Sequence, residues 1–270
     1  MSGIILGSGL AYMHPSAQTF NLVIFLLAIG TTLCLQILSN LANELGDAQK
    51  GTDRDQHERE AYGLQAGTIT VRQMKGMIWL YLGLSVIFGS ILIFIAFGSF
   101  RTVQSWVFLG LGALAIIGAV TYTLGKHNYG YVGLGDVGVL VFFGLLSTMG
   151  AYYLQTQTMC WEVFWCSVAI GLPCVGVLNL NNIRDMSNDR AHGKRTIAGK
   201  LGPVGARVYH YLLLLCCLLI FVLTGHYWTC LIVPVWAWHA WYIGTHTKNL
   251  DKQMPVLMFS TLVVAILGIF

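Results

Sequence analysis

Long apolar runs alternate with polar connections along the whole chain. Eight of these runs reach about 20 residues, the length an α-helix needs to cross the hydrocarbon layer of a membrane. A shorter run at 3–13 is about half a span, and we interpret it as a re-entrant segment or the remainder of a longer helix. The eight runs cover residues 20–39, 77–98, 106–124, 137–154, 161–180, 208–224, 228–243 and 256–270. This pattern predicts an all-α fold, a polytopic membrane bundle of about nine helices forming a single domain over residues 1–270.

The composition supports a membrane protein. The 270 residues are 56% hydrophobic and only 10% charged, whereas a soluble domain has about 25% charged residues. Basic blocks are absent, which argues against a nucleic-acid partner, and no pattern points to a protein partner. The seven cysteines lie in or beside apolar runs without a CxxC pair. We therefore interpret them as small buried side chains rather than as zinc ligands or disulfides.

Basic residues gather on one side of the predicted membrane. If the run at 3–13 counts as a first helix, every Lys and Arg except Arg101 lies in connections on the same side. The positive-inside rule assigns that side to the cytoplasm and predicts an integral protein of the cell's inner (plasma) membrane, with its active site facing the cytoplasm. No carboxylate lies at the middle of a span, which argues against an ion-coupled transporter. The connections on the basic side are 40–76, 125–136, 181–207 and 244–255.

Two polar clusters follow apolar runs on the predicted cytoplasmic side. The first is Asn43–Gly51 and the second is Asn181–Gly193. In both, Asn, Asp and Gly recur at four-residue steps, which places the polar side chains on one face of a helix. The similarity of the two clusters predicts a weak internal repeat, with halves at 20–154 and 161–270.

The residue types in these clusters indicate a metal–diphosphate site. Two facing stripes of Asp repel one another unless cations lie between them, and ligand sets made only of oxygen favour Mg²⁺. Magnesium held by few carboxylates completes its shell with water and phosphate oxygens. Helix capping, the alternative interpretation, explains one Asp or Asn at a helix end but not two carboxylates four residues apart. A diphosphate whose remainder lies in the membrane is a polyprenyl diphosphate. The cations available to clamp its phosphates are Lys50, Arg184, Arg190, Lys194 and Arg195.

Four stretches resemble one family of membrane enzymes. Residues 35–53, 64–70, 122–144 and 179–196 are similar to the UbiA superfamily of aromatic prenyltransferases, and in particular to its branch that acts on 1,4-dihydroxy-2-naphthoate. In that branch a Lys-Gly-x insertion precedes the last Asp of the first motif, and Lys50–Asp53 reproduces it. The resemblance implies nine helices around a central cavity that is open to the cytoplasm.

The resemblance also implies an activity and a set of site residues. The expected reaction transfers a polyprenyl group from polyprenyl diphosphate to 1,4-dihydroxy-2-naphthoate, releases diphosphate and CO₂, and gives demethylmenaquinone of the menaquinone (vitamin K2) pathway. Mg²⁺ is the expected cofactor. Asn43 binds diphosphate in the first motif, and the expected metal ligands are Asp47, Asp53, Asp185 and Asp189.

The chain departs from the family pattern in three places. Glu44 stands where relatives commonly have Asp, which keeps the carboxylate. Residues 60–62 replace a Pro-x-Arg element, so Arg59 or another nearby cation must take the place of the missing Arg. The chain also begins partway through the family's first helix, which a start codon assigned too late would explain and which does not imply a different fold.

The connection at 125–136 and its flanks supply further candidates. Tyr122, Tyr129 and Tyr131 offer aromatic faces that can stabilise an allylic cation, although aromatic residues are also common at membrane interfaces. Lys126 is the only Lys or Arg of this connection and is predicted to bind the acceptor's carboxylate. Asp136 is predicted to accept a proton from the acceptor, with a helix cap as the alternative. Together with Asp47 and Asp185, Lys126 and Asp136 form the predicted catalytic set.

Alternative functions make different demands on the sequence. A superfamily member with another acceptor, such as 4-hydroxybenzoate, homogentisate or a preformed naphthoquinone, would keep the Asp motifs but lose the signature at 122–144. A membrane transporter would need polar groups that continue across the middle of the bilayer. A structural scaffold would leave the duplicated Asn and Asp stripes unexplained.

Overall fold

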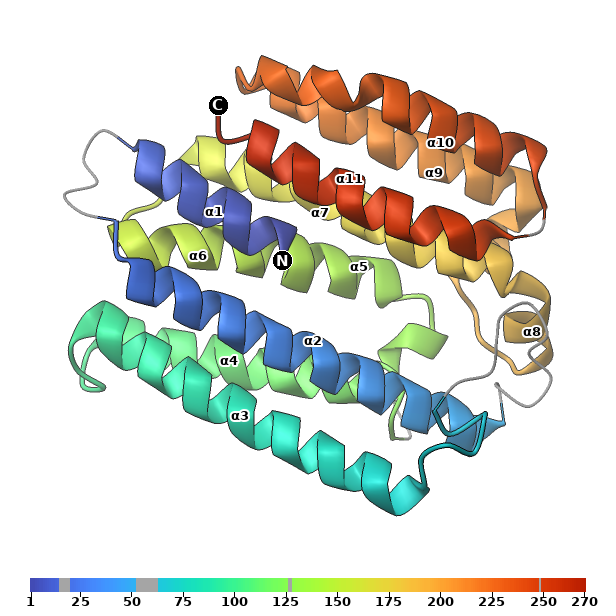
Figure 1. Ribbon diagram of the computed structural model, residues 1–270, viewed down its shortest axis with the longest axis horizontal. Helices are drawn as coiled ribbons and strands as arrows, with labels where there is room; N and C mark the ends of the chain where they lie inside the picture. Colours follow the sequence, from blue (N-terminus) through green and yellow to red (C-terminus); the bar gives the residue numbers. More distant parts are fainter. Residues whose placement is uncertain (15–19, 52–62, 126–127, 248) are drawn as a thin grey trace.

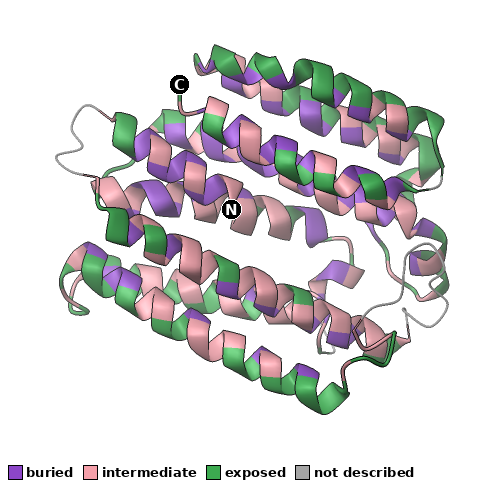
Figure 2. Cartoon of the chain, viewed as in Figure 1, coloured by how far each residue is buried: buried purple, intermediate pink, exposed green. Residues whose placement is uncertain are grey.

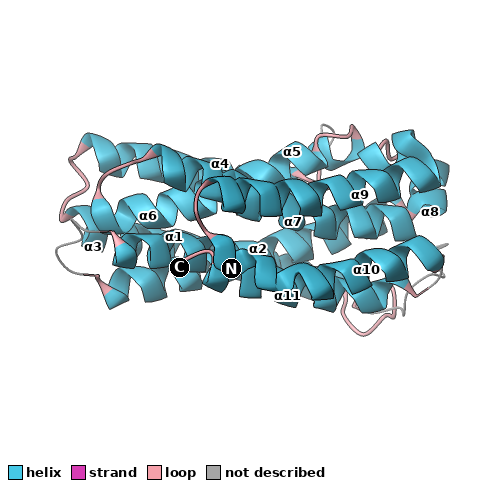
Figure 3. Cartoon of the chain, turned by 90° about the horizontal axis from the view of Figure 1, so that it is seen from above, coloured by secondary structure: helices cyan, strands magenta, loops and turns pink. Residues whose placement is uncertain are grey.

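The computed structural model is a bundle of helices that run along its longest axis (Figure 1). Turning the bundle by 90° shows only helices and loops (Figure 3), and none of the residues described is in a β-strand. The prediction of an all-α bundle is confirmed. The structure describes residues 1–14, 20–51, 63–125, 128–247 and 249–270.

Seven helices of the described chain are long and apolar enough to cross a membrane. The shorter α1 and the segment formed by η3 and α10 bring the count close to the nine predicted. A π-helical stretch, η2, joins α5 to α6 in one continuous rod, Gly135–Thr156. The α-helices are α1 (Ser2–Met13), α2 (Leu22–Lys50), α3 (Val71–Phe97), α4 (Val103–Thr121), α5 (Gly135–Val139), α6 (Ser147–Thr156), α7 (Trp161–Arg184), α8 (Met186–Ala191), α9 (Ile197–Leu223), α10 (Val233–Thr245) and α11 (Gln253–Leu267). The short helices are η1 (Tyr129–Tyr131), η2 (Leu140–Leu146), η3 (Tyr227–Ile232) and η4 (Leu250–Lys252).

Two helices extend further than their apolar runs. The run at 20–39 becomes α2, which continues to Lys50, and the run at 208–224 becomes α9, which begins at Ile197 and is kinked at Gly202 (φ 73°, ψ 176°), just before Pro203. Hydropathy marks only the part of a helix that lies in lipid, because helical turns outside the bilayer add nothing to the apolar signal. The polar clusters are therefore carried on or beside helices rather than in extended loops.

Helix α7 lies at the centre of one half of the bundle. In its apolar window 61% of residues are buried, against 11% for α4. It packs against α9, α11, α1 and the rod Gly135–Thr156. Glycines allow the closest of these contacts, since a Cβ on Gly144 would come within 2.8 Å of the Cα of Gly171. Exposed positions gather instead on the outward sides of α3 and α10 (Figure 2).

The other half consists of α2, α3 and α4, which pack against one another. Contacts of α2 and α3 with α6, and of α1 with α2, join this half to the rest. The half reaches the rod Gly135–Thr156 through α6, and an apolar groove runs between α4 and that rod. The fold thus provides an apolar hollow whose lining includes Tyr129 of η1.

The cysteines only partly follow our interpretation. All seven are free thiols, and Cys34, Cys166 and Cys217 are buried as expected. Cys216 and Cys230 are exposed, so the interpretation was wrong for these two. In a membrane protein an apolar residue faces lipid as readily as it faces the core, so hydropathy alone does not decide between the two.

Candidate active site

The first motif lies on the last turns of α2. Asn21 caps the start of this helix by accepting hydrogen bonds from backbone N–H groups of its first turn. Gly51 ends it with a φ of 75°, a left-handed conformation that glycine adopts without strain. Asn43, Asp47 and Lys50 follow one another at steps of four and three and therefore share one face. We call this end of the bundle, where α2 and α7 stop, the motif end.

Thr123 attaches the connection between α4 and α5 to the first motif. Its Oγ1 donates to Asn43 Oδ1 at 2.8 Å, and its carbonyl accepts from Lys50 Nζ at 2.8 Å. Asn128 Nδ2 donates to the same carbonyl at 3.1 Å. A Cβ at Gly46 would come within 2.5 Å of Thr123 Cγ2, so a glycine is needed for this approach. Two side chains of the motif are thereby held in fixed positions.

The second motif begins where α7 ends. Asp185 leaves helical geometry, with φ −92° and ψ 9°, and α8 continues directly after it. Arg184 donates from Nε and Nη2 to the two carboxylate oxygens of Asp185, at 2.7 and 2.6 Å. One helical turn further on, Lys194 Nζ lies 3.4 Å from Asp189 Oδ1. Each carboxylate of this motif is thus accompanied by a cation.

Asp189 is the most deeply buried carboxylate of the site. Its residue is 2% exposed, and its Oδ2 has no hydrogen-bond partner among the described residues. Burial raises the pKa of Asp189 to about 6; Lys194 acts in the opposite direction, and Asp185 and Asp47 raise it further. An ionised carboxylate with a free buried oxygen is unfavourable, and a bound cation would relieve that cost.

Tyr131 connects the two motifs. Its hydroxyl donates to Asp47 Oδ1 at 2.7 Å. Lys50 Nζ lies 3.6 Å from the centre of its ring, and Lys194 Nζ lies 5.6 Å from it. The carbonyl of Tyr131 accepts from the backbone N–H of Arg195 at 2.9 Å. Segments far apart in the sequence therefore meet at this one side chain.

A second carboxylate lies at the start of α5. Asp136 is 6% exposed, and Tyr209 of α9 donates to its Oδ2 at 3.0 Å. A Cβ at the neighbouring Gly135 would be 3.0 Å from the hydroxyl oxygen of Tyr122. The Tyr122 hydroxyl therefore lies against the start of α5, close to the Asp136–Tyr209 pair.

Tyr122 lies between this pair and the motif carboxylates. Its ring meets that of Tyr129 edge to face, with the ring centres 5.2 Å apart. Burial raises the pKa of Tyr122 well above its usual value, and Tyr129, Asp136, Asp47 and Asp189 all contribute in the same direction. Tyr122 thus adjoins the start of α5 on one side and Tyr129 of η1 on the other, and η1 also carries Tyr131, which bonds to Asp47.

An apolar groove begins at Tyr129, and we call it the lateral groove. It has a volume of about 970 Å³ and runs between α4 and the rod Gly135–Thr156. At the motif end, Tyr129 lines it and donates a hydrogen bond to Gly118 O at 3.0 Å. At the opposite end, the rings of Phe108 and Tyr153 stack with their centres 5.7 Å apart. Its walls include Leu111, Leu114 and Ile117 of α4 and Val137, Val141 and Leu145 of the rod.

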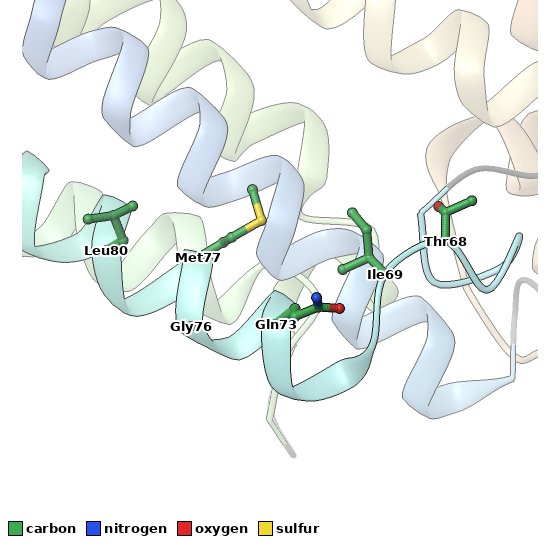
Figure 4. Close-up of a pocket in the computed structure, with 6 residues that line it drawn as sticks. All are labelled: Thr68, Ile69, Gln73, Gly76, Met77 and Leu80. Atoms are coloured by element: carbon green, nitrogen blue, oxygen red, sulfur yellow. The ribbon is translucent and has the colours of Figure 1, made fainter.

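A smaller hollow lies on the surface of α3, at the same end of the bundle. Figure 4 shows its lining, which includes Thr68, Gln73 and Met77. Its volume is about 380 Å³, and the described residues that line it carry no charge. Thr70 and Gln73 form a capping box that starts α3 beside it. Gln73 therefore has a structural role in starting the helix, and the hollow offers no cation to a phosphate.

The structure places most of the predicted site residues together. Arg190 stands apart, because it is exposed and donates from Nη2 to the carbonyl of Gly199 at 2.6 Å. Asp53 and Lys126 lie outside the described residues, so their roles stay predictions. The residues brought together are Asn43, Asp47, Lys50, Tyr122, Tyr129, Asp136, Arg184, Asp185, Asp189 and Lys194.

Glu44, which keeps the carboxylate of the first motif in the sequence, accepts from the backbone N–H of Leu64 at 2.7 Å and so holds the connection before α3. Two further residues, Thr123 and Tyr209, shape the site without having been predicted to do so. Thr123 lies in the stretch 122–144 that resembles the family, and its position beside Tyr122 in that stretch was the only sequence feature that could have indicated its role. Tyr209 lies inside the apolar run of α9, where no sequence pattern distinguishes it.

The donor set suits a hard divalent cation. Within the parts of the chain that the structure describes, no three His, Cys, Asp or Glu residues are close enough to hold one ion by themselves. Mg²⁺, however, is usually held by one or two carboxylates together with water and substrate phosphates. The oxygen-only donors, the buried free oxygen of Asp189 and the mutual repulsion of Asp47, Asp185 and Asp189 fit such a site.

Comparisons with known proteins agree with this geometry. The chain is 39% identical to the 1,4-dihydroxy-2-naphthoate octaprenyltransferase of Haemophilus influenzae, over 100% of this chain and 89% of the relative. It is 42% identical to the enzyme of the same name from Escherichia coli, over 88% of this chain and 74% of the relative.

Among solved structures, the chain is similar to the apo structure of a UbiA homolog from Aeropyrum pernix. The TM-score is 0.67 at 18% identity, covering 98% of this chain and 96% of that chain, which establishes the shared fold. The model of the UbiA prenyltransferase family matches residues 4–263. The resemblance noted in the sequence is thereby confirmed, and the chain belongs to the UbiA prenyltransferase family.

Proposed function

We propose that the protein transfers a polyprenyl group from polyprenyl diphosphate to 1,4-dihydroxy-2-naphthoate, releasing diphosphate and CO₂. The observation that carries this proposal is the position of two facing carboxylate motifs at the end of an apolar groove. A substrate with a highly charged head and a long apolar tail fits such an arrangement. The names of the two bacterial relatives support the naphthoate acceptor.

Mg²⁺ is the proposed cofactor. Asp47, Asp185 and Asp189 would hold it together with the phosphates, with Asp53 as a further predicted ligand. When bound, Mg²⁺ neutralises the charge that develops on diphosphate as the allylic C–O bond breaks. Asp189 gives the metal its least solvated ligand, because that carboxylate is already buried.

The diphosphate would be held by cations from both motifs. Lys50 and Lys194 lie near the same ring, that of Tyr131, and can turn from it toward a bound phosphate. Arg184 keeps Asp185 oriented through two hydrogen bonds. Asn43 is held by Thr123, so its amide can donate to a phosphate oxygen. Arg190 is left out of this proposal because of its bond to Gly199.

The prenyl chain would lie in the lateral groove. Tyr129 separates the groove from Tyr122, so a chain lying there places its first carbons beside the aromatic rings. Their faces stabilise the allylic cation, and the apolar walls exclude water from it. A groove that follows the rod Gly135–Thr156 across the bundle suits a chain of many isoprene units.

The acceptor would bind on the Asp136 side of Tyr122. Asp136 can accept the proton of a naphthol hydroxyl, and Tyr209 holds that carboxylate in place. A bond then forms between the prenyl carbon and the ring carbon that carries the carboxylate, the carboxylate leaves as CO₂, and Asp136 returns the proton to the naphthol oxygen. Lys126 remains the predicted partner of the carboxylate before it is lost.

We place the motif end on the cytoplasmic side of the inner membrane, because the basic connections lie there. The alternating helices then put Phe270 at the outer face. A reporter domain fused after Phe270 that is active only outside the cytoplasm should be active. Activity of a cytoplasmic reporter at the same position would reverse this orientation.

The direct test is prenyl transfer in membranes or detergent, with 1,4-dihydroxy-2-naphthoate and a polyprenyl diphosphate, with and without Mg²⁺. We expect Mg²⁺-dependent demethylmenaquinone formation that Asp47→Ala and Asp185→Ala each abolish. Absence of transfer to any aromatic acceptor by folded protein would refute the proposal. Transfer to 4-hydroxybenzoate in place of the naphthoate would keep the metal site and change only the acceptor.

The groove and the acceptor side can be tested separately. Val141→Trp fills the lateral groove and should raise KM for a long polyprenyl diphosphate more than for a short one. Ile87→Trp, on the lipid-facing side of α3, is the matched control and should change KM for neither the long nor the short polyprenyl diphosphate. Asp136→Asn and Tyr209→Phe should lower kcat with the naphthoate while leaving KM for the diphosphate near its normal value. If these variants raised KM for the polyprenyl diphosphate as much as they impaired the reaction of the naphthoate, an acceptor site at Asp136 would be refuted.

A further inference from the structure

Tyr131 makes contacts that none of the roles described so far requires. It touches Asp47 and Lys50 of the first motif, and Lys194 and the backbone of Arg195 beyond the second. It lies in η1, whose other tyrosine, Tyr129, faces the lateral groove. Two neighbouring phenols of one short helix therefore serve different sides of the site.

We infer that Tyr131 is a positioning residue that orients Asp47 for the metal and holds Lys50 and Lys194 in readiness for diphosphate. The inference rests on the proposed function and assigns to this side chain a role in assembling the binding site. It differs from the cation-stabilising role that the sequence suggested for the tyrosines of this segment.

The hydroxyl accounts for the first part of the role. At 2.7 Å from Oδ1 it makes a short, charge-assisted hydrogen bond to Asp47. It fixes the rotation of the carboxylate through Oδ1, so that the second oxygen would be the one offered to a metal ion. Hydrogen bonds of this kind, made to a ligand from behind, tune how well the ligand binds metal.

The ring accounts for the second part. Lys50 and Lys194 carry like charges that repel, yet both ammonium groups lie near the same aromatic ring, at 3.6 and 5.6 Å from its centre. The negative potential of the ring face offsets that repulsion and keeps both cations close together. Lys194 is also paired with Asp189 at 3.4 Å, so its position links the ring to the buried carboxylate.

Two substitutions separate the hydroxyl from the ring. Tyr131→Phe removes only the hydrogen bond. We expect the Mg²⁺ concentration for half-maximal transfer to rise about tenfold, as it does when other groups that orient metal ligands are removed. The value of kcat at saturating Mg²⁺ should change little. Tyr131→Leu also removes the ring, and KM for the polyprenyl diphosphate should then rise as well. Tyr227→Phe, exposed at the opposite end, is the control.

Thermal unfolding in detergent gives a readout that does not depend on turnover. Mg²⁺ with inorganic diphosphate should raise the Tm of the parent protein, and Tyr131→Phe should need about tenfold more Mg²⁺ for the same rise. The unliganded Tm of each variant shows whether it is folded. The two variants thereby report on metal binding and on diphosphate binding separately.

The outcomes that overturn the inference are distinct from those that overturn the function. Unchanged Mg²⁺ dependence of Tyr131→Phe in both assays would refute an orienting role. A large loss of kcat at saturating Mg²⁺, with unchanged Mg²⁺ and diphosphate affinities, would assign Tyr131 to the chemical step instead. If the parent showed no transfer, the proposed reaction would fail, while the unfolding assay would still test Tyr131.

Discussion

Neutralising Asp189 should stabilise the metal-free protein while abolishing its activity. The substitution Asp189→Asn keeps the shape of the side chain and removes its charge. In the folded protein the pKa of Asp189 is raised from 3.8 to about 6, mainly by burial. At about 1.4 kcal/mol for each tenfold change, the ionised form is disfavoured by about 3 kcal/mol. The amide of the variant would not carry this cost above about pH 6, because it has no charge to bury.

The pH dependence follows from the direction of this shift. Below about pH 4 the carboxyl group is protonated in the folded and the unfolded chain, and the two proteins should be about equally stable. As the pH rises from about 4 to about 6, the unfolded chain releases its proton before the folded protein does. The parent therefore loses stability over this window, and the difference from Asp189→Asn becomes constant above about pH 7.

Thermal unfolding in Mg²⁺-free detergent at about pH 7.5 measures this difference. We expect the Tm of Asp189→Asn to exceed that of the parent by about 5 °C or more. Adding Mg²⁺ with inorganic diphosphate should raise the Tm of the parent and have much less effect on the variant. Glu162→Gln, at an exposed carboxylate of the opposite end, is the control; its Oε1 lies 3.3 Å from His226 Nε2, and because the amide can keep a hydrogen bond there, Tm should change little and transfer should stay unaltered. A lower Tm for metal-free Asp189→Asn would refute the reasoning, because it would show that the native structure favours the ionised carboxylate.

Two further predictions concern the core. His210 Nε2 and His239 Nε2 lie 3.1 Å apart in a fully buried pair between α9 and α10. His210→Leu should lower the free energy of unfolding by about 1–3 kcal/mol, measured by thermal unfolding, and leave the KM values for both substrates unchanged. A changed KM for the acceptor would connect this pair to the site. Gly144→Ala should destabilise the protein by about 1–3 kcal/mol because its Cβ meets Gly171, whereas Gly83→Ala, with open space around it, should not. Equal Tm values for these two variants would contradict the close packing of the rod against α7.

Local patterns predict the helices and the charged motifs well, for reasons that the structure makes plain. The bilayer requires long apolar stretches, so hydropathy locates them without knowledge of the fold. The four-residue steps of Asn43 and Asp47 hold because α2 is continuous there. The same rule is less useful after Asp185, where the helix is interrupted. Arg190 follows that break and bonds to α9 instead of joining the site, although its charge and position made it a good candidate.

The residues that sequence patterns miss are those whose role depends on contacts between distant segments. Tyr209 is one aromatic residue within the apolar run of α9, and only the packing of both α5 and α9 against α7 brings it within hydrogen-bond distance of Asp136. Thr123 and Tyr131 carry no charge, yet they hold Asn43, Lys50 and Asp47 in place. Such contacts leave no periodic signal, since they depend on the path of one connection across the ends of other helices.

The connection between α4 and α5 therefore determines how the site is assembled. The two motifs end on helices from different halves of the bundle, and the lateral groove runs between α4 and the rod Gly135–Thr156. Thr123 and Tyr131, both in this connection, bond to α2, and the carbonyl of Tyr131 bonds to the segment after α8. The apolar contacts that join the two halves lie along the bundle, between α2 or α3 and α6 and between Phe108 and Tyr153. At the motif end the polar contacts of this short connection add a further link, which places the residues that fix the geometry beside those that carry the charge.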